Sequence, residues 1–227
     1  MVTNHHVIEN ADQIRVRLDD GRSFEAKVVG ADPEADVAVI QIPAQGLQAI
    51  NIGDSAALRV GDFVVAIGNP FGLSQTATSG IVSALGRSGL GIEGYEDFIQ
   101  TDASINFGNS GGALVNLRGE LIGVNTAILA RGGGNVGIGF AIPVNMVMSL
   151  TAQIIEFGEV RRGRLGVHIQ DLTPELAQAF GIETGSGALI SKVMPDSAAQ
   201  AADLREGDVI TMVDGRAIKG AAELRNV

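Results

Sequence analysis

The 227-residue sequence contains no cysteine, and this absence excludes several kinds of chemistry. A chain without cysteine forms no disulfide, holds no cysteine-ligated zinc and has no thiol nucleophile. Basic residues are also scarce, 16 against 26 acidic ones, which gives a formal net charge of -10. Because nucleic-acid binding needs a basic surface to neutralise phosphates, this balance argues against a nucleic-acid partner. No apolar run approaches the ~20 residues of a membrane-spanning helix.

Aromatic residues make up only 4% of the sequence, whereas glycine accounts for 31 residues. Glycine thus has roughly twice its usual share of about 7%. Many glycines and few aromatic residues indicate many tight turns, which favours a fold built mostly from β-strands. The chain is 45% hydrophobic, which is enough for a sizeable core. Its length fits one large domain, or a medium one followed by a small one.

Short apolar segments between turn residues predict a series of strands. Residues 13–18 and 23–28 alternate polar and apolar side chains around an Asp-Gly turn, which is typical of a hairpin. Regularly spaced short strands of this kind predict a barrel or a sandwich. Further strands are expected at 37–42, 63–67, 80–85, 113–115, 121–127 and 137–142.

The pattern changes after Pro143, where apolar residues recur every three or four positions until Gly158. Proline at the start and glycine just past the end are typical of a single amphipathic helix. The basic stretch 161–164 resembles a linker, and a second alternating block begins at Leu165. We therefore expect two domains, residues 1–159 and residues 160–227.

The segment Gly108-Asn109-Ser110-Gly111-Gly112 carries the clearest chemical signal. A serine between glycines can expose its hydroxyl on a tight turn, and successive backbone N–H groups there can converge on an oxyanion. An ordinary Gly/Ser turn is the alternative. The segment also fits the nucleophile elbow of α/β-hydrolases, but that fold needs a histidine after the serine. The only later histidine, His168, lies in the second predicted domain.

A serine nucleophile needs a base, and the remaining histidines are His5 and His6. Residues adjacent on a strand point to opposite sides, so at most one of the two is expected to act. Asp36, at the head of an apolar strand, is the candidate that orients the imidazole. A purely structural role for the histidine and a solvated strand start for Asp36 are the alternatives.

Several segments together resemble the HtrA family of serine endoproteases. The resemblance lies in residues 3–8 (Thr-Asn-His-His-Val-Ile), 32–38, 68–72, 100–106, 108–116 and 137–143, in the family's order. It implies that His6 is the general base, Asp36 the orienting acid and Ser110 the nucleophile. It further implies an oxyanion hole from the amides of Gly108, Asn109 and Ser110, and an S1 pocket around Ile105, Ile128 and Ile138 that favours small aliphatic side chains.

The second block resembles a PDZ domain, which binds a peptide C-terminus through a backbone loop and takes the peptide as an added strand. The resemblance implies that peptide contacts come from Arg162, Arg164, Leu165, Gly166, Val167 and Leu224. A solvated linker position is the alternative for Arg162. Asp203 stands where the family usually has glycine, a substitution that the left-handed backbone region tolerates.

These features predict an all-β-dominated fold: a chymotrypsin-like double β-barrel with an incomplete first barrel, followed by a partial PDZ domain. We expect strands to be missing before His6 and the PDZ domain to be cut near Val227. Gly89–Gly94 matches Gly-x-Gly-x-x-Gly but opens no clear helix, so no dinucleotide site is expected. The sequence predicts no cofactor and no metal.

The resemblance implies an ATP-independent serine endoprotease of the bacterial periplasm that degrades unfolded or misfolded proteins. It also implies binding of peptide C-termini at the PDZ domain and a trimer-based homo-oligomer. The alternative function is a non-proteolytic chaperone or peptide-binding module.

Overall fold

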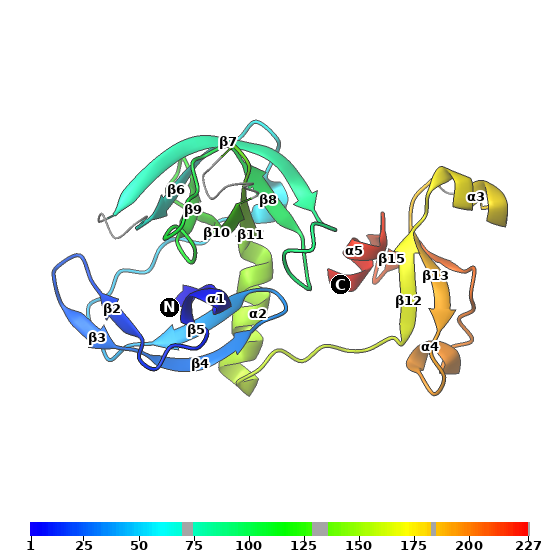
Figure 1. Ribbon diagram of the computed structural model, residues 1–227, viewed down its shortest axis with the longest axis horizontal. Coiled ribbons are helices and arrows are strands. Elements are labelled where there is room, and N and C mark those ends of the chain that lie inside the picture. The colour runs from blue at the N-terminus through cyan, green and yellow to red at the C-terminus, as the bar shows by residue number, and fades with distance from the viewer. Residues whose placement is uncertain (70–74, 129–135, 183–184, 227) are drawn as a thin grey trace. The chain divides into compact units, whose positions relative to one another are not determined.

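The chain divides into two compact units, Met1–Arg161 and Arg162–Val227. Strands predominate in the first unit, whereas the second combines short strands and short helices (Figure 1). The computed structural model describes residues 1–69, 75–128, 136–182 and 185–226. For Ala127 and Ile128 it describes the backbone alone.

The first unit begins with an open three-stranded sheet in the order β1-β5-β4. A short helix, α1, follows the first strand directly, and a separate hairpin, β2–β3, precedes β4. In the hairpin Val16 faces Phe24, which is the register expected for the Asp-Gly turn between the two strands. The bounds are β1 Val2–Thr3, α1 His5–Ile8, β2 Arg15–Arg17, β3 Ser23–Glu25, β4 Lys27–Asp32 and β5 Val37–Gln41.

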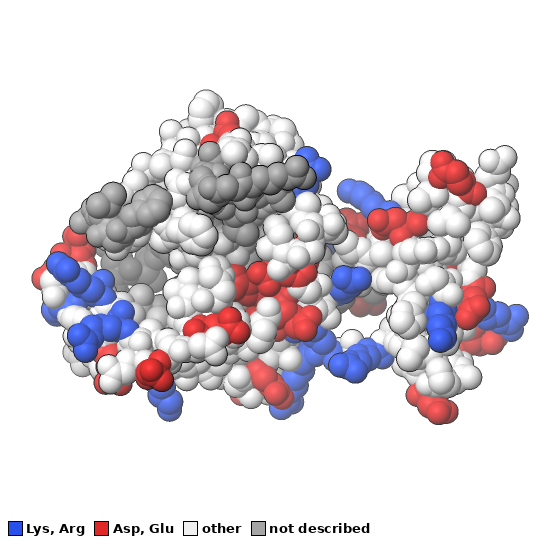
Figure 2. Space-filling model, in the orientation of Figure 1, with Lys and Arg blue, Asp and Glu red and all other residues white. Residues whose placement is uncertain are grey.

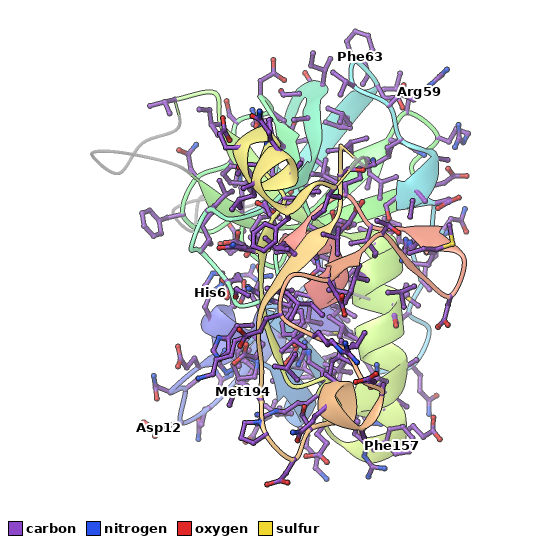
Figure 3. All side chains as sticks on the ribbon, turned by 90° about the vertical axis from the view of Figure 1, so that its right-hand side faces the viewer. His6, Asp12, Arg59, Phe63, Phe157 and Met194 are labelled. Atoms are coloured by element: carbon purple, nitrogen blue, oxygen red, sulfur yellow. The ribbon has the colours of Figure 1, made fainter. Side chains whose placement is uncertain are left out.

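The rest of the first unit is a closed barrel with the strand order β10-β11-β8-β7-β6-β9. Alternate residues point inward and form a buried cluster that includes Val64, Ile99 and Leu114. Phe63, by contrast, is 62% exposed and points away from the barrel (Figure 3). A short 3-10 helix, Ser55–Ala57, precedes the barrel, whose strands are β6 Phe63–Gly68, β7 Thr76–Arg87, β8 Phe98–Thr101, β9 Ala113–Asn116, β10 Leu121–Ile128 and β11 Gly139–Pro143.

Helix α2, Val144–Phe157, joins the open sheet and the barrel through one core. Its fully buried residues Val147 and Ile154 pack with strand residues of both, including Val37 and Phe140. Burying an aliphatic side chain contributes about 1.5–3 kcal/mol, so this apolar face holds the sheet that carries Asp36 against the barrel that carries Ser110. The helix ends at Gly158 in the left-handed conformation.

The second unit contains a three-stranded sheet in the order β12-β13-β14 and a two-stranded sheet, β15–β16. Side-chain caps start two of its helices, Thr173 for α3 and Ser197 for α4. Helix α5 packs against β12 and β13. The bounds are β12 Val167–Asp171, α3 Pro174–Phe180, β13 Ala188–Val193, α4 Ala198–Ala201, β14 Val209–Ile210, β15 Met212–Val213, β16 Arg216–Ala217 and α5 Ala221–Asn226.

Most of the expected elements are confirmed, including the hairpin, the barrel strands and the amphipathic helix. Asp203 has a φ of 59°, the left-handed conformation expected for it. The expectation that His5 and His6 are adjacent residues of a strand is wrong, because the strand stops at Thr3 and both residues lie in α1. The segment 68–72 lies partly outside the described residues. No helix in the described ranges is long and apolar enough to cross a membrane.

Candidate active site

The candidate site centres on an imidazole–carboxylate pair. His6 Nδ1 lies 2.8 Å from Asp36 Oδ2, and the His6 backbone N–H donates to the other carboxylate oxygen, Oδ1, at 2.9 Å. Two bonds from one residue to one carboxylate fix both the position and the tilt of the ring. With Nδ1 engaged, Nε2 is the nitrogen left to exchange a proton with another group.

Asp36 is only 2% exposed and has a φ of 53°. Its carbonyl accepts hydrogen bonds from the His5 N–H at 3.3 Å and from Asn4 Nδ2 at 3.0 Å. A left-handed backbone is unusual for a residue with a side chain, although aspartate tolerates it better than most. The conformation turns the carboxylate toward α1 and away from the strand that follows.

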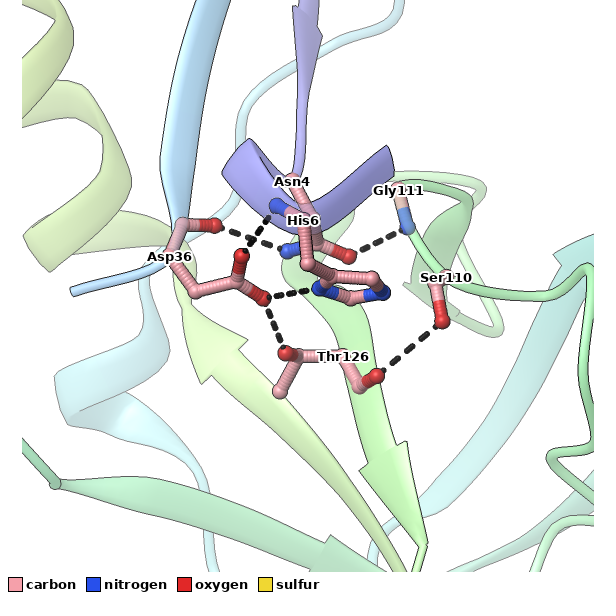
Figure 4. A network of polar contacts seen from close by, with 6 residues as sticks. All are labelled: Asn4, His6, Asp36, Ser110, Gly111 and Thr126. Carbon is pink, nitrogen blue, oxygen red and sulfur yellow. Dashed lines mark hydrogen bonds and ion pairs between the residues drawn. The ribbon is translucent and has the colours of Figure 1, made fainter. Parts of the chain in front are cut away.

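Thr126 is the extra residue of a β-bulge in β10. On the neighbouring strand β11, Asn125 pairs with Ala141 and Ala127 pairs with Phe140, which leaves Thr126 without a partner in the ladder. Its hydroxyl donates to Asp36 Oδ2 at 2.6 Å, and its carbonyl accepts from Ser110 Oγ at 3.1 Å (Figure 4). Bulges re-aim side chains next to active sites, and this one connects the carboxylate to the serine.

Ser110 lies on the turn between β8 and β9, and its hydroxyl bonds to Thr126, not to His6. His6 and Ser110 line the same cleft (Figure 4). Hydrogen bonds between catalytic groups are often absent or poorly aligned before substrate binds. The structure therefore brings the three triad candidates into one site, with the bond from serine to histidine unformed.

The glycines around Ser110 are required by the backbone. Gly108 and Gly111 have φ values of 94° and 77°, and a Cβ on Gly111 would collide with the Thr3 hydroxyl. The Gly111 N–H donates to Asn4 Oδ1 at 2.5 Å, so Asn4 joins the serine turn to Asp36 through its two amide atoms. Asparagine suits this position because it carries both a donor and an acceptor.

The three backbone N–H groups expected at the oxyanion hole differ in whether they already donate a hydrogen bond within the protein. The Asn109 N–H donates to the Asn106 carbonyl at 3.0 Å and is not available to a ligand. The N–H groups of Gly108 and Ser110 donate to no other residue that the structure describes. The sequence signal, a run of small residues, could not separate these amides because their directions depend on the turn's dihedral angles.

Hydrogen bonding and burial shift the pKa values of His6 and Asp36 in opposite directions. The hydrogen bond with Asp36 raises the pKa of His6 above its ordinary value, although desolvation opposes this. Burial tends to raise the pKa of Asp36, but the bonds from the His6 ring, Thr126 and the His6 N–H outweigh burial and hold that pKa low. The arrangement favours the ion pair of imidazolium and carboxylate, the form that a base adopts after taking a proton.

A cleft of about 310 Å³ opens beside this pair. His6, Ser110 and Thr126 line it, together with Glu93, Ile105, Asn106 and Phe107. Of the three isoleucines expected at an S1 pocket, Ile105 lines the cleft, whereas Ile138 packs against the core that includes α2. The Ile128 side chain lies outside the described residues.

The residues expected to bind peptides in the second unit lie at the start of β12 and in α5. Gly166 has a φ of 80°, and a Cβ there would collide with Ser197. The carbonyls of Leu165 and Gly166 accept from the Ala199 and Met194 N–H groups, both at 2.8 Å. Val167 begins β12, Leu224 lies in α5, and Arg162 and Arg164 precede the strand.

Sequence reasoning missed Thr126, Glu93 and Phe107. A polar pair, Asn125-Thr126, inside an otherwise apolar strand was the available signal for Thr126. Glu93 and Phe107 lie in loops that give no such signal. Among the described residues there is no group of three or more His, Asp or Glu side chains placed to hold a metal ion.

Comparison with known families places two domains in the chain. A trypsin-like peptidase domain matches residues 1–124, and a PDZ domain matches residues 153–227. The chain is 62% identical over 226 residues to the periplasmic serine endoprotease DegP of Salmonella typhimurium, covering 99% of this chain and 48% of the relative. It is 57% identical to the periplasmic pH-dependent serine endoprotease DegQ of Escherichia coli, covering 100% and 50%.

Solved structures of an HtrA-type protease also match nearly the whole of this chain. The HtrA-type protease AlgW with a tripeptide matches at 50% identity with a TM-score of 0.89, over 99% of this chain and 75% of that one. AlgW with a decapeptide matches at 50% identity with a TM-score of 0.84, over 99% and 69%. The chain spans about half the length of the curated relatives it matches. The relatives' names agree with the periplasmic location expected from the resemblance.

Proposed function

Since the chain belongs to the HtrA-type family of trypsin-like serine proteases that carry a PDZ domain, we propose that it hydrolyses peptide bonds in unfolded or misfolded proteins. The observation that carries this proposal is the His6–Asp36 pair, held by two hydrogen bonds beside Ser110 in one cleft. A hydroxyl, an imidazole and a buried carboxylate in one site are the parts that acyl transfer needs.

The proposed mechanism begins with a turn of the Ser110 hydroxyl from Thr126 toward His6, a rotation between staggered side-chain positions. Ser110 Oγ then attacks the scissile carbonyl carbon while His6 Nε2 takes the hydroxyl proton. Asp36 holds the imidazolium that results. The carbonyl oxygen becomes an oxyanion, which we assign to the N–H groups of Gly108 and Ser110 because the Asn109 N–H is engaged.

Collapse of this intermediate breaks the C–N bond, and His6 returns its proton to the leaving amine. Water then attacks the acyl-enzyme with His6 as the base, which releases the new carboxyl terminus and restores Ser110. The base must be neutral at both attacks. Since the pKa of His6 is raised above 6.5, we expect kcat/KM to fall as the pH decreases through that raised value.

We assign Ile105 to the wall of an S1 pocket that accepts small aliphatic side chains, with Ile128 and Ile138 as further candidates. Ile105 lines the cleft beside Ser110, which supports its role. An apolar wall disfavours a charged substrate side chain, because that side chain would lose its hydration without gaining a partner.

We assign the second unit to binding of peptide C-termini. The Gly166 turn and the start of β12 supply backbone groups, and α5 packs beside β12 with Leu224 in it. We place the boundary near residue 160. The PDZ match begins at residue 153, but Ile154 is fully buried in the core of the first unit, which supports the later boundary. A trimer-based assembly stays part of the proposal.

A second candidate function is to hold unfolded clients without cutting them. The observation that favours it is the Ser110 hydroxyl, which bonds to Thr126 and leaves the triad unassembled in this conformation. Proteolysis requires the Ser110 hydroxyl, whereas holding a client does not. The substitution Ser110→Ala therefore separates the two functions.

The test is proteolysis of a permanently unfolded protein by the wild type and by Ser110→Ala, with aggregation of the same client measured in parallel. We expect cleavage by the wild type only and suppression of aggregation by both. The paired variants His5→Ala and His6→Ala test the base, and we expect only the latter to abolish cleavage. Cleavage by Ser110→Ala would overturn the nucleophile assignment, and suppression of aggregation by both without any cleavage would favour the holding function.

A further inference from the structure

Both apolar and acidic side chains line the cleft beside Ser110. Ile105 and Phe107 contribute apolar surface, and Phe107 is 69% exposed. Glu93 contributes a carboxylate. Figure 2 shows acidic side chains gathered on the first unit, in the region where Figure 1 draws the loop between β7 and β8 that carries Glu93. The mechanism above uses none of this negative charge.

The loop that carries Glu93 is fixed by a second, buried carboxylate. Glu96 is 6% exposed and accepts hydrogen bonds from the N–H groups of Leu90 and Ile92, both at 2.6 Å, and from the Glu93 N–H at 3.1 Å. The loop is also tied to the first sheet, because the Tyr95 N–H donates to the Glu34 carbonyl at 2.8 Å. Glu93 therefore has a defined place in the cleft lining.

The Glu93 carboxylate itself accepts no hydrogen bond from any residue that the structure describes. The charged groups that face it are His6 on α1, Asp36 ahead of β5 and Glu96 on its own loop, while Glu34 contacts the neighbouring Gly94. Partial burial first, and then the charge of Asp36, raise the pKa of Glu93 to about 7. It is thus a half-buried carboxylate that still lacks a cationic partner of its own.

We propose that Glu93 is a specificity-determining residue that favours a lysine or arginine side chain next to the scissile bond, on the His6 side of the cleft. The proposal rests on the proteolytic function proposed above and adds a substrate class to it. A cationic side chain would supply the ion pair that Glu93 lacks, whereas a glutamate or aspartate there would meet Glu93 and Asp36 as like charges.

The pH dependence of this preference follows from the ionisation of Glu93. Above pH 7 the carboxylate is mostly charged and attracts a cation, and below pH 7 it becomes neutral. Protonation of His6 lowers cleavage of every substrate alike, so it cancels in a ratio of two substrates. The preference for lysine over glutamine should therefore weaken between pH 8 and pH 6, even though both peptides are cleaved more slowly.

The experiment measures kcat/KM for peptides that carry Lys, Gln or Glu at each of the two positions on either side of the scissile bond. At one position the wild type should prefer Lys over Gln by roughly fivefold to tenfold at pH 8, the size expected of a partly exposed charge pair. Glu93→Gln should reduce that ratio to about one, and Glu93→Asp should retain part of it. Equal ratios in the wild type and in Glu93→Gln at every position would overturn the proposal.

Glu9→Gln is the matched control. Glu9, like Glu93, raises the pKa of His6 through its charge, but it does not line the cleft. If any negative charge near His6, and not a contact with Glu93, set the preference, Glu9→Gln would change the ratios in the same way. We expect Glu9→Gln to keep the wild-type ratio, and loss of the ratio in both variants would contradict a direct contact with substrate.

A binding measurement separates this proposal from the proteolytic one. The same peptides are titrated against Ser110→Ala, with and without Glu93→Gln, by fluorescence anisotropy. Labelling of Ser110 with a fluorophosphonate reports independently whether the nucleophile works. Tighter binding of the Lys peptide that depends on Glu93 supports the proposal even if no peptide is cut, and equal binding of the Lys and Gln peptides counts against it even if Ser110 is labelled.

Discussion

Asp36 and Glu93 are two carboxylates beside the same imidazole, and their environments shift their pKa values in opposite directions. Asp36 is almost fully buried, yet its pKa lies below the ordinary value because three hydrogen bonds stabilise the charged form. Glu93 is less buried, yet its pKa rises to about 7, because partial burial and then the charge of Asp36 disfavour its charged form and no hydrogen bond offsets them. Burial sets the cost of a charge, and hydrogen bonding decides whether that cost is offset.

The largest expected effect comes from removing the charge of Asp36. Asp36→Asn keeps the shape of the side chain but presents an amide to the imidazole, which removes the ion pair and favours the wrong tautomer of His6. The expected loss of kcat is about 10³–10⁴-fold, as for the corresponding change in other triads. The remaining activity should also reach its midpoint at a lower pH, because the Asp36 bond raises the pKa of His6. A loss of less than tenfold in a folded variant would contradict the role of Asp36.

Thr126→Val tests how far hydrogen bonds, and not burial, stabilise the charged form of Asp36. The variant removes the hydroxyl that lies 2.6 Å from Asp36 Oδ2 and keeps the side-chain shape. Losing a bond to a buried charge should lower the free energy of unfolding by about 2 kcal/mol. Both urea denaturation and peptide hydrolysis report the change, and kcat/KM should fall by roughly tenfold.

Thr151→Val is the matched control for that variant. Thr151 is also buried, but its hydroxyl makes no hydrogen bond with any residue that the structure describes. Replacing it with a methyl group should leave the stability unchanged or raise it slightly. Equal destabilisation by the two valine substitutions would show that the hydrogen bond from Thr126 to Asp36 does not itself stabilise the protein.

Glu93→Gln tests the opposite case, a carboxylate without hydrogen-bond donors. Because its pKa rises from 4.5 to about 7 on folding, the folded state binds more protons than the unfolded state between those pH values, and stability falls as the pH rises through that window. Removing the charge should stabilise the protein by about 1 kcal/mol at pH 8, after a discount for solvent screening of a half-exposed group.

The same substitution should have little effect at pH 4, where Glu93 is mostly protonated in both the folded and the unfolded state. Urea denaturation at the two pH values measures the difference. Glu96→Gln should act in the reverse direction, because the Glu96 carboxylate accepts hydrogen bonds from backbone N–H groups, among them those of Leu90 and Ile92, and its pKa is lowered. Destabilisation by Glu93→Gln at pH 8 would mean that Glu93 has a partner after all.

The smallest effect is expected at Asp20, a carboxylate with a partner but without burial. Asp20 bonds to Arg22 at 2.7 Å in the hairpin between β2 and β3, and both side chains are about half exposed. Water screens such pairs, so Asp20→Asn should change neither the denaturation midpoint nor the activity measurably. A clear loss of stability would show that hydrogen bonding to a carboxylate matters here even without burial.

Much of the fold could be predicted from local patterns. The period-2 segments became strands, and the apolar spacing between Pro143 and Gly158 became α2. The helical turn at His5–Ile8 could not be predicted in this way, because four residues after a strand carry too little periodicity. The strand β8, with three of its four residues buried, was also missed, because its sequence Phe-Ile-Gln-Thr is neither an apolar run nor an alternation of polar and apolar residues.

The sequence by itself determined the residue types of the site and their order: histidine, aspartate and a serine between glycines. These are chemical requirements of acyl transfer and can be recognised without coordinates. Only the tertiary structure decided that Thr126 connects Asp36 to Ser110, that the Asn109 amide is engaged, and that Glu93 lines the cleft. Each of these depends on a bulge, a turn angle or a loop position, because contacts between residues far apart in the chain are set by packing and not by local sequence.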